Sequence, residues 1–128
     1  MIAFLTVCAA LSSPPAIPTE QLLAGVQSLH SGGNPASLIA WDQAQPLVVS
    51  PEGRIFAAAA TLGSGRIVAL GHGGFIGTDE ADSEVFAANA VLWLAGEATQ
   101  PVRIFGLPKA VEGELQTRAV EMQVVRGS

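Results

Sequence analysis

One stretch, residues 46–74, constrains the fold of this chain more than any other. It holds three apolar runs of strand length separated by two tight turns. The runs are 46–50, 54–61 and 67–70, and the turns are 50–53 and 62–65. Proline and glycine in the first turn and two glycines in the second favour chain reversal, so the stretch predicts three strands joined by hairpins. The last run is apolar without alternation, which predicts a strand buried on both faces of a layered sheet.

The residues before this stretch predict a helix and a further strand. Apolar residues at helical spacing indicate a helix at 20–29 that Thr19 could cap. His30 follows in its last turn, where a cation suits the helix dipole. Residues 37–42 are expected to form a strand that places Trp41 in the core.

The residues after the stretch predict a buried helix and a parallel unit. The helix at 84–94, capped by Asp82 or Ser83 and ended by Gly96, is apolar most of the way round and is therefore expected to be buried. A strand, a helix and a strand are expected at 102–107, 108–118 and 120–125. Such an order predicts a right-handed βαβ unit.

These elements together predict an α/β fold, a layered sheet with flanking helices. Because a pair of parallel strands is an unusual end for a domain, we expect the fold to be incomplete and the chain to be a fragment. The expected parts are a leader at 1–18 and an α/β module at 19–128. Within the module, a hairpin-rich part at 19–98 precedes the start of the βαβ unit at 99–128.

The first eleven residues form an apolar run followed by Ser-Ser-Pro-Pro. A signal peptide has this shape, and it predicts a secreted or cell-envelope protein. No Lys or Arg precedes the run, so a buried N-terminal strand at 2–7 is the alternative, and the protein would then be cytoplasmic. A lipoprotein in which Cys8 is acylated fits less well, because bulky Val7 precedes it.

Composition excludes several classes of protein. The net charge is −5, and the six Lys and Arg residues are scattered, so binding to nucleic acid through phosphate contacts is not expected. A single cysteine allows neither an internal disulfide nor a cysteine-based metal site. No run after the leader is long enough to span a membrane, and no cofactor is predicted.

The Gly-His-Gly-Gly motif at 71–74 is the most suggestive candidate for chemistry. It places His72 after a central strand, where α/β proteins bind ligands. The chain has no Gly-x-Ser-x-Gly elbow to supply a nucleophile, and its glycines match neither a phosphate loop nor a dinucleotide fingerprint. A structural role for His72 is therefore favoured over a catalytic one.

Four carboxylates before and within the first turn of the buried helix could offer oxygens to a divalent cation. They are Asp79, Glu80, Asp82 and Glu84. Their spacing does not fit a calcium loop, and carboxylates are favoured at a helix N-terminus in any case. A structural role is again favoured. Asn89, inside the buried helix, needs a hydrogen-bond partner and is expected to tie the helix to a neighbouring loop.

The order of these motifs resembles a known family. The segments concerned are 22–26, 46–49, 51–53, 57–60, 63–68, 71–72 and 89–94, and they contain Gly63, Gly65, Arg66, Gly71, Asn89 and Trp93 as structural motif residues. The chain resembles the N-terminal region of the TRP-channel-associated factors and of related proteins with enhancin-like (mucin-targeting) metallopeptidase domains. The resemblance implies a fold similar to class I glutamine amidotransferases.

Departures from the family pattern limit what the resemblance implies about activity. Gly73 follows His72 where members often have glutamate, and Cys8 in the leader is no counterpart of the amidotransferase cysteine. A His-Glu-x-x-His zinc motif is absent from the sequence. The resemblance therefore implies a non-catalytic accessory module, the front part of a longer protein.

Three functions remain open from the sequence. The first is a non-catalytic α/β module that contacts a protein or a glycan. The second is a hydrolase-like or amidotransferase-like enzyme that uses His72 with acids from the 79–84 loop. The third is a secreted carbohydrate-binding domain with Trp41 as its stacking platform.

Overall fold

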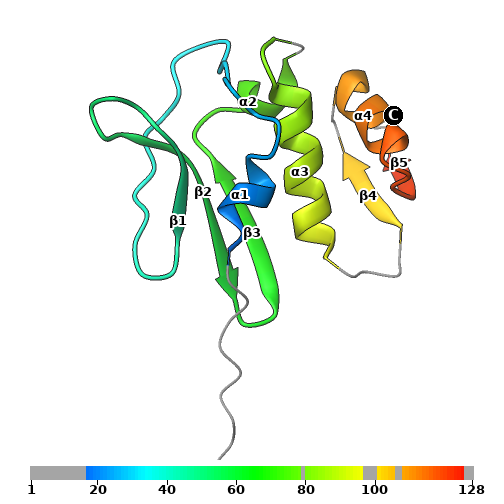
Figure 1. The fold of residues 1–128 in the computed structure, drawn as a ribbon, viewed down its shortest axis with the longest axis horizontal. Coiled ribbons are helices and arrows are strands. Elements are labelled where there is room, and N and C mark those ends of the chain that lie inside the picture. The colour runs from blue at the N-terminus through cyan, green and yellow to red at the C-terminus, as the bar shows by residue number, and fades with distance from the viewer. Residues whose placement is uncertain (1–16, 79, 97–100, 106–107, 126–128) are drawn as a thin grey trace, which may run out of the picture.

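The structure, a computed structural model, describes residues 17–78, 80–96, 101–105 and 108–125. A long central helix lies between a three-stranded sheet and a smaller strand–helix–strand unit (Figure 1). The predicted mixture of helices and strands is thus observed, with the hairpins first and the βαβ unit last. No helix among the described residues is long and apolar enough to cross a membrane.

The first sheet consists of β1 (Gln45–Val49), β2 (Ile55–Leu62) and β3 (Gly65–Leu70), in that order and with antiparallel pairing. Gly53 and Gly63, in its two turns, have φ angles of 81° and 58°, a region that glycine adopts without strain. The three predicted strands and both hairpins are therefore confirmed.

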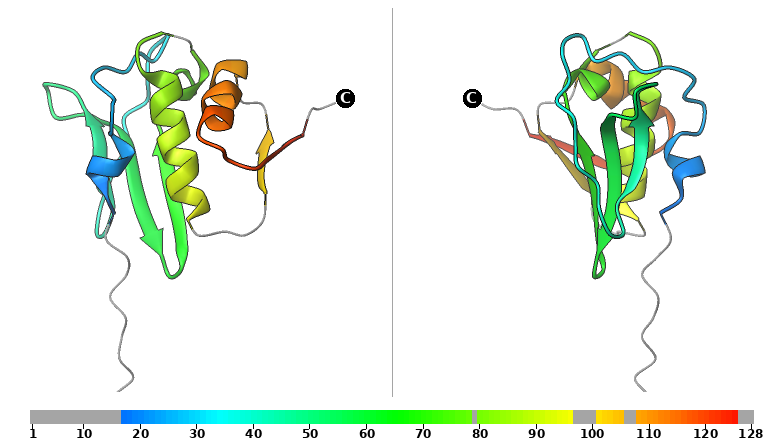
Figure 2. Two further views of the ribbon diagram at one scale, coloured as in Figure 1. Left: turned by 45° about the vertical axis from the view of Figure 1, so that its right-hand side comes forward. Right: turned by 90° about the vertical axis from the view of Figure 1, so that its left-hand side faces the viewer.

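The burial predicted for β3 is wrong. Its residues alternate between half-buried and exposed, and Ile67 is 46% exposed whereas its neighbour Val68 packs against the core. The physical reason is that helices cover one face of the sheet only: α1 and α3 lie on the same side of it (Figure 2). Alternate side chains of a strand point to opposite faces.

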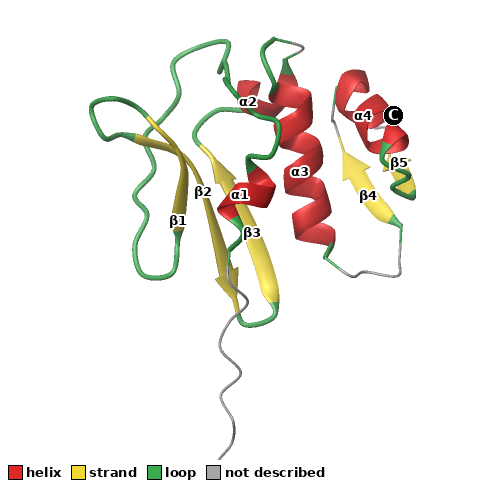
Figure 3. Cartoon of the chain, in the orientation of Figure 1, coloured by secondary structure: helices red, strands yellow, loops and turns green. Residues whose placement is uncertain are grey.

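Two predictions before β1 also need correction. The first helix, α1 (Thr19–Leu22), has one turn, and Pro18 rather than Thr19 is its N-cap. Gly25, with φ at 73°, takes the chain out of helical geometry soon afterwards. Residues 37–42 form no strand; they contribute a single bridge between Leu38 and Ile55 in a connection that is otherwise loop (Figure 3).

The central helix is α3 (Ser83–Ala95), preceded by the short α2 (Gly74–Gly77) and ended by Gly96. One side of α3 buries Phe86, Ala90 and Trp93 against α1 and the first sheet. Another side buries Ala87 and Ala88 against α4. Apolar neighbours on both sides explain why the sequence of α3 is apolar most of the way round.

The last unit consists of β4 (Val102–Phe105), α4 (Lys109–Thr117) and β5 (Met122–Val125). The two strands pair in parallel, with Val102 opposite Met122. Val111 and Leu115 of α4 are wholly buried in the cluster that contains Ala87 and Ala88. The predicted order and the parallel pairing are confirmed.

Asn89, in the middle of α3, joins the two halves of the molecule. It is 4% exposed, and its Nδ2 donates hydrogen bonds to the carbonyls of Leu22 (3.1 Å) and Ala24 (2.8 Å). Its Oδ1 accepts a bond of 2.6 Å from Nη1 of Arg118. The Nε of Arg118 also donates to Glu114 (2.8 Å) on α4. This is the kind of tie to a neighbouring loop that the sequence predicts for a buried asparagine.

Replacing Asn89 with alanine should therefore destabilise the whole domain. Asn89→Ala leaves the two carbonyls and the Arg118 guanidinium without this partner, which should cost about 2 kcal/mol or more. Urea unfolding measures the loss. Asn34→Ala, an exposed asparagine in the loop before β1, is the matched control and should lie within about 0.5 kcal/mol of wild type. Equal stability of the two variants would contradict the role assigned to Asn89.

Candidate functional site

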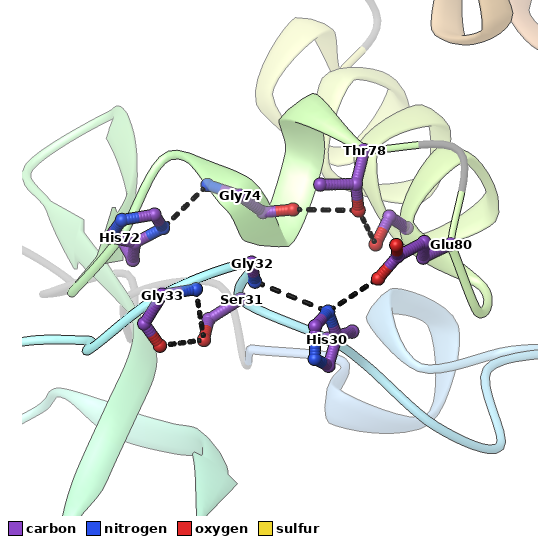
Figure 4. Close-up of polar contacts among 9 residues, drawn as sticks. His30, Ser31, Gly32, Gly33, His72, Gly74, Thr78 and Glu80 are labelled. Atoms are coloured by element: carbon purple, nitrogen blue, oxygen red, sulfur yellow. Dashed lines mark hydrogen bonds and ion pairs between the residues drawn. The ribbon is translucent and has the colours of Figure 1, made fainter.

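His72 lies two residues after the end of β3, close to where the sequence predicts it. Its Nδ1 accepts a hydrogen bond of 3.0 Å from the backbone N–H of Gly74 (Figure 4). A Cβ atom added to Gly33 would lie 3.2 Å from Nε2 of His72, so Gly33 lies close to the ring. The His72 residue is half-buried.

Two glycines of the histidine motif, Gly71 and Gly74, are explained by a close approach of the backbone. A Cβ on Gly74 would lie 1.6 Å from the carbonyl oxygen of Ser31, and one on Gly71 would lie 2.0 Å from that of Ala36. The amide of Ala36 also donates to the carbonyl of Gly71 (3.0 Å). The Gly-His-Gly-Gly motif therefore seats the 31–36 loop against the end of β3.

No catalytic arrangement forms around His72 in the part of the chain that the structure describes. The nearby Ser31 hydroxyl donates to the carbonyl of Gly33 (2.7 Å), so it is engaged within its own loop. Neither ring nitrogen of His72 bonds to a carboxylate among the described residues. A nucleophile, base and acid in contact, which a hydrolase of this type needs, are not brought together there.

Two of the acidic candidates, Glu80 and Asp82, make separate contacts. Glu80 lies 2.6 Å from Nδ1 of His30, and both side chains are more than half exposed, so the pair contributes little to stability. Gly32 also donates to that Nδ1 (3.2 Å), so the two contacts alternate: Nδ1 accepts from Gly32 when it carries no hydrogen and donates to Glu80 when it does.

Asp82, at the start of α3, forms hydrogen bonds with the loop that follows α1. Its Oδ2 accepts backbone hydrogen bonds from Gln27 (2.8 Å) and Ser28 (3.0 Å). The N–H groups of Ser28 and Gln27 lower the pKa of the Asp82 carboxyl below its ordinary value. The fourth candidate, Glu84, lies in the first turn of α3, and Asp79 lies outside the described residues.

The described residues do not assemble a metal centre. Among them, no three histidine, cysteine or acidic side chains come close enough to hold an ion. Glu80 and Asp82 point to different partners, one to His30 and the other to the backbone after α1.

Arg66 and Trp93, singled out by the resemblance, make one structural contact. The Nη1 of Arg66 donates to the carbonyl of Trp93 (2.5 Å), and its guanidinium lies 5.7 Å from the centre of the Trp93 ring. A cation suits the C-terminal end of a helix and the face of an indole. Gly96 leaves the room, since a Cβ there would lie 2.5 Å from Arg66.

The outer face of the first sheet carries an apolar cluster that the sequence did not predict, although the carbohydrate-binding alternative required an exposed Trp41. Four large apolar side chains are exposed there, namely Ile39 (84%), Trp41 (72%), Leu62 (75%) and Ile67 (46%). They line a hollow of about 400 Å³. Trp41 was expected in the core, and this is wrong, because 37–42 does not pair as a strand. The signal that could have indicated exposure is the Asp-Gln turn directly after Trp41.

Comparison with known proteins places this geometry in a family. The family model described as "TRPM8, N-terminal domain" matches residues 7–126, nearly the whole chain. The chain belongs to this family. It is 32% identical over 117 residues to TRPM8 channel-associated factor 2 of Bos taurus, and 38% identical over 78 residues to the TRPM8 channel-associated factor homolog of Danio rerio. No solved structure matches.

The matches cover unequal shares of the proteins compared. The bovine alignment takes in 89% of this chain and 13% of the bovine protein, and the zebrafish alignment 59% and 8%. The chain thus spans a small part of the length of these relatives. The predicted resemblance to TRP-channel-associated factors is confirmed, whereas the likeness to amidotransferases and enhancin-like peptidases is not among these matches and stays a prediction.

The expected secreted or cell-envelope localisation is wrong. The family's members are named as factors associated with a channel, and the family match begins at residue 7, inside the apolar run that suggested secretion. The predicted leader itself lies outside the described residues.

Substitution at two neighbouring glycines tests the structural account of the histidine motif. Gly74→Ala should destabilise the chain by about 2 kcal/mol or more, because its Cβ would overlap the Ser31 carbonyl. Gly73→Ala should be neutral or stabilising by up to about 1 kcal/mol, since Gly73 is helical and an added Cβ would meet nothing within 4 Å. Urea unfolding of both variants measures the difference, and similar effects would refute the account.

The pH dependence of stability tests the contact made by Asp82. A lowered pKa in the folded state adds stability above the unfolded value of about 3.9, and that stability is lost as the pH falls through the folded pKa. Asp82→Asn should therefore unfold at lower urea than wild type at pH 7, and the gap should shrink as the pH falls below about 4. Glu20→Gln controls for the loss of one surface charge. A gap independent of pH would count against the contact.

Proposed function

We propose that this chain is a non-catalytic accessory module that binds a protein partner. One observation carries the proposal: the exposed apolar face formed by Ile39, Trp41, Leu62 and Ile67. Exposed apolar side chains that gather around one hollow are typical of protein interfaces, because monomeric proteins rarely leave large contiguous apolar patches uncovered. The engagement of His72 with backbone supports the non-catalytic part of the proposal.

The names of the relatives support a membrane channel as the partner. Both are named as factors or homologs of factors associated with the TRPM8 channel. Because the chain corresponds to a small part of those proteins, the proposal assigns it a share of the contact and not their whole activity. An α/β module with an apolar face can supply such a contact to a part of the channel that lies outside the bilayer.

We infer that the two sheets represent an incomplete amidotransferase-like or flavodoxin-like layer, and that the chain is the front part of a longer protein. The parallel β4–α4–β5 unit supports this inference, because parallel sheets normally contain more than two strands and are covered on both faces.

A binding experiment with the channel tests the proposed function. The immobilised chain should retain purified TRPM8 in nanodiscs above the level of an unrelated channel, and His72→Ala should retain it equally. Asn89→Ala, unfolded by added urea at a concentration that wild type withstands, is the negative control. Absence of retention by the folded wild-type chain would contradict the proposed partner.

A substrate screen tests the enzyme alternative separately. Esterase, amidase and glycosidase substrates should show no turnover above buffer with the wild-type chain. Turnover that His72→Ala abolishes while the urea midpoint stays unchanged would overturn the non-catalytic assignment.

A further inference from the structure

The edge of β3 that faces away from β2 carries a row of unpaired backbone groups. In an antiparallel pair, residues that bond across the ladder alternate with residues whose N–H and C=O groups point the other way. The amide of Gly71 donates to the carbonyl of Phe56 (2.8 Å), which fixes this alternation for β3. Arg66, Val68 and Leu70 therefore point their backbone groups away from β2, and no described residue bonds to them there.

The neighbouring edge of β4 is open in the same way. The amide of Val102 donates to the carbonyl of Glu121 (3.0 Å), so Val102 and the alternate residue Ile104 bond toward β5. The backbone groups of Arg103 and Phe105 point to the opposite edge, where no described residue pairs with them. Figure 1 shows β4 between β3 and β5, so this edge is turned toward β3.

The β3–α3–β4 segment has the form of a parallel crossover unit whose strands do not pair. The guanidinium of Arg66, near the start of β3, bonds to the carbonyl of Trp93, near the end of α3, so the helix runs back along the strand. The arrows of β3 and β4 point the same way in Figure 1. Parallel strands joined by a helix belong to one sheet, as neighbours or with another strand between them. In this chain β3 and β4 belong to separate sheets.

Helix α3 leaves an apolar side chain exposed between the two sheets. Ala90 packs in the cluster with the first sheet, and Ala87 packs in the cluster with α4 and β4. Leu94 lies one turn after Ala90 and two turns after Ala87, so it lies on the strip of α3 between the two clusters. Its exposed fraction is 42%. A strand between β3 and β4 would cover this strip.

Two facing open edges indicate the chemistry of what would join them. Water can satisfy the open edge of an antiparallel sheet, but parallel sheets normally contain more than two strands and are buried. The two rows of N–H and C=O groups match the backbone of an extended segment, because strand addition satisfies such groups on both sides of the added strand. Alternate side chains of that segment would face α3 and meet Leu94, so these positions should be apolar.

We propose that an extended strand, apolar on the side toward α3, inserts between β3 and β4. It runs parallel to both strands and joins the two sheets into one. The strand is supplied by the remainder of a longer protein, so the inference rests on the proposal that this chain is the front part of one. It adds where the missing strand belongs and which backbone groups bind it.

A tethered strand tests the insertion site directly. The probe is six residues of alternating Val and Thr, attached after Ser128 through about 12 Gly and Ser residues, a flexible linker with a span of roughly 20 Å. Native-state hydrogen exchange is measured by NMR with and without the tether. In the dilute chain alone, the amides of Val68 and Arg103 should exchange faster than the bonded amides of Ala69 and Ile104. The tethered strand should slow Val68 and Arg103 by roughly tenfold or more.

Matched controls separate insertion from general stabilisation. A tether with Pro in place of each Val lacks half of the donors and should not slow the two amides. Leu94→Ser should leave the urea midpoint of the untethered chain unchanged, because the side chain is exposed, but should reduce the slowing by roughly fivefold. Leu62→Ser, which removes a side chain that is 75% exposed on β2, should not reduce it.

Three outcomes would overturn the proposal. Slow exchange of Val68 and Arg103 in the dilute untethered chain would show that the edges are already closed, and its loss on removal of residues 1–16 would identify that segment as the occupant. Slow exchange at high protein concentration alone would identify a second copy. Fast exchange that the Val-Thr tether leaves unchanged would show that the edges accept no strand. Retention of TRPM8 is measured independently, so the channel partner and the insertion site can each fail without the other.

Discussion

The buried amide of Asn89 is the contact on which the arrangement of this domain depends. Its nitrogen holds the carbonyls after α1 and its oxygen holds Arg118 at the end of α4, so one side chain joins the two halves across α3. A polar group inside an apolar helix is tolerated because both ends of the amide are satisfied. The apolar surroundings of α3, with the first sheet on one side and α4 on the other, set the geometry that lets Asn89 reach both.

Local chemistry made much of this fold predictable. The two hairpins follow from the glycines of their turns, and α3, α4 and the parallel strands follow from apolar periodicity and from their order in the chain. Contacts between distant segments decided the rest. Gly71 and Gly74 are required by the 31–36 loop, which lies far from them in the chain, and no local pattern indicates that the two segments come together.

The exposure of the outer face likewise could not be predicted from local sequence. A strand of the composition of β3 is usually covered on both sides, and a tryptophan in a short apolar run is usually buried. Whether either holds depends on what packs against the sheet, and in this chain α1 and α3 cover one face only. The candidate site is therefore the face that Trp41 and Ile67 share, because the surroundings of His72 are structural. A binding face agrees with a family whose members are named for association with another protein.

Native-state hydrogen exchange tests most directly the claim that α3 couples both halves into one cooperative unit. The amides of Ala57 and Ala59 in β2 and those of Val111 and Leu115 in α4 should open with the same free energy, and Asn89→Ala should lower all four together. Exchange of the α4 amides at a clearly lower free energy, unaffected by Asn89→Ala, would show two independent units and contradict the account.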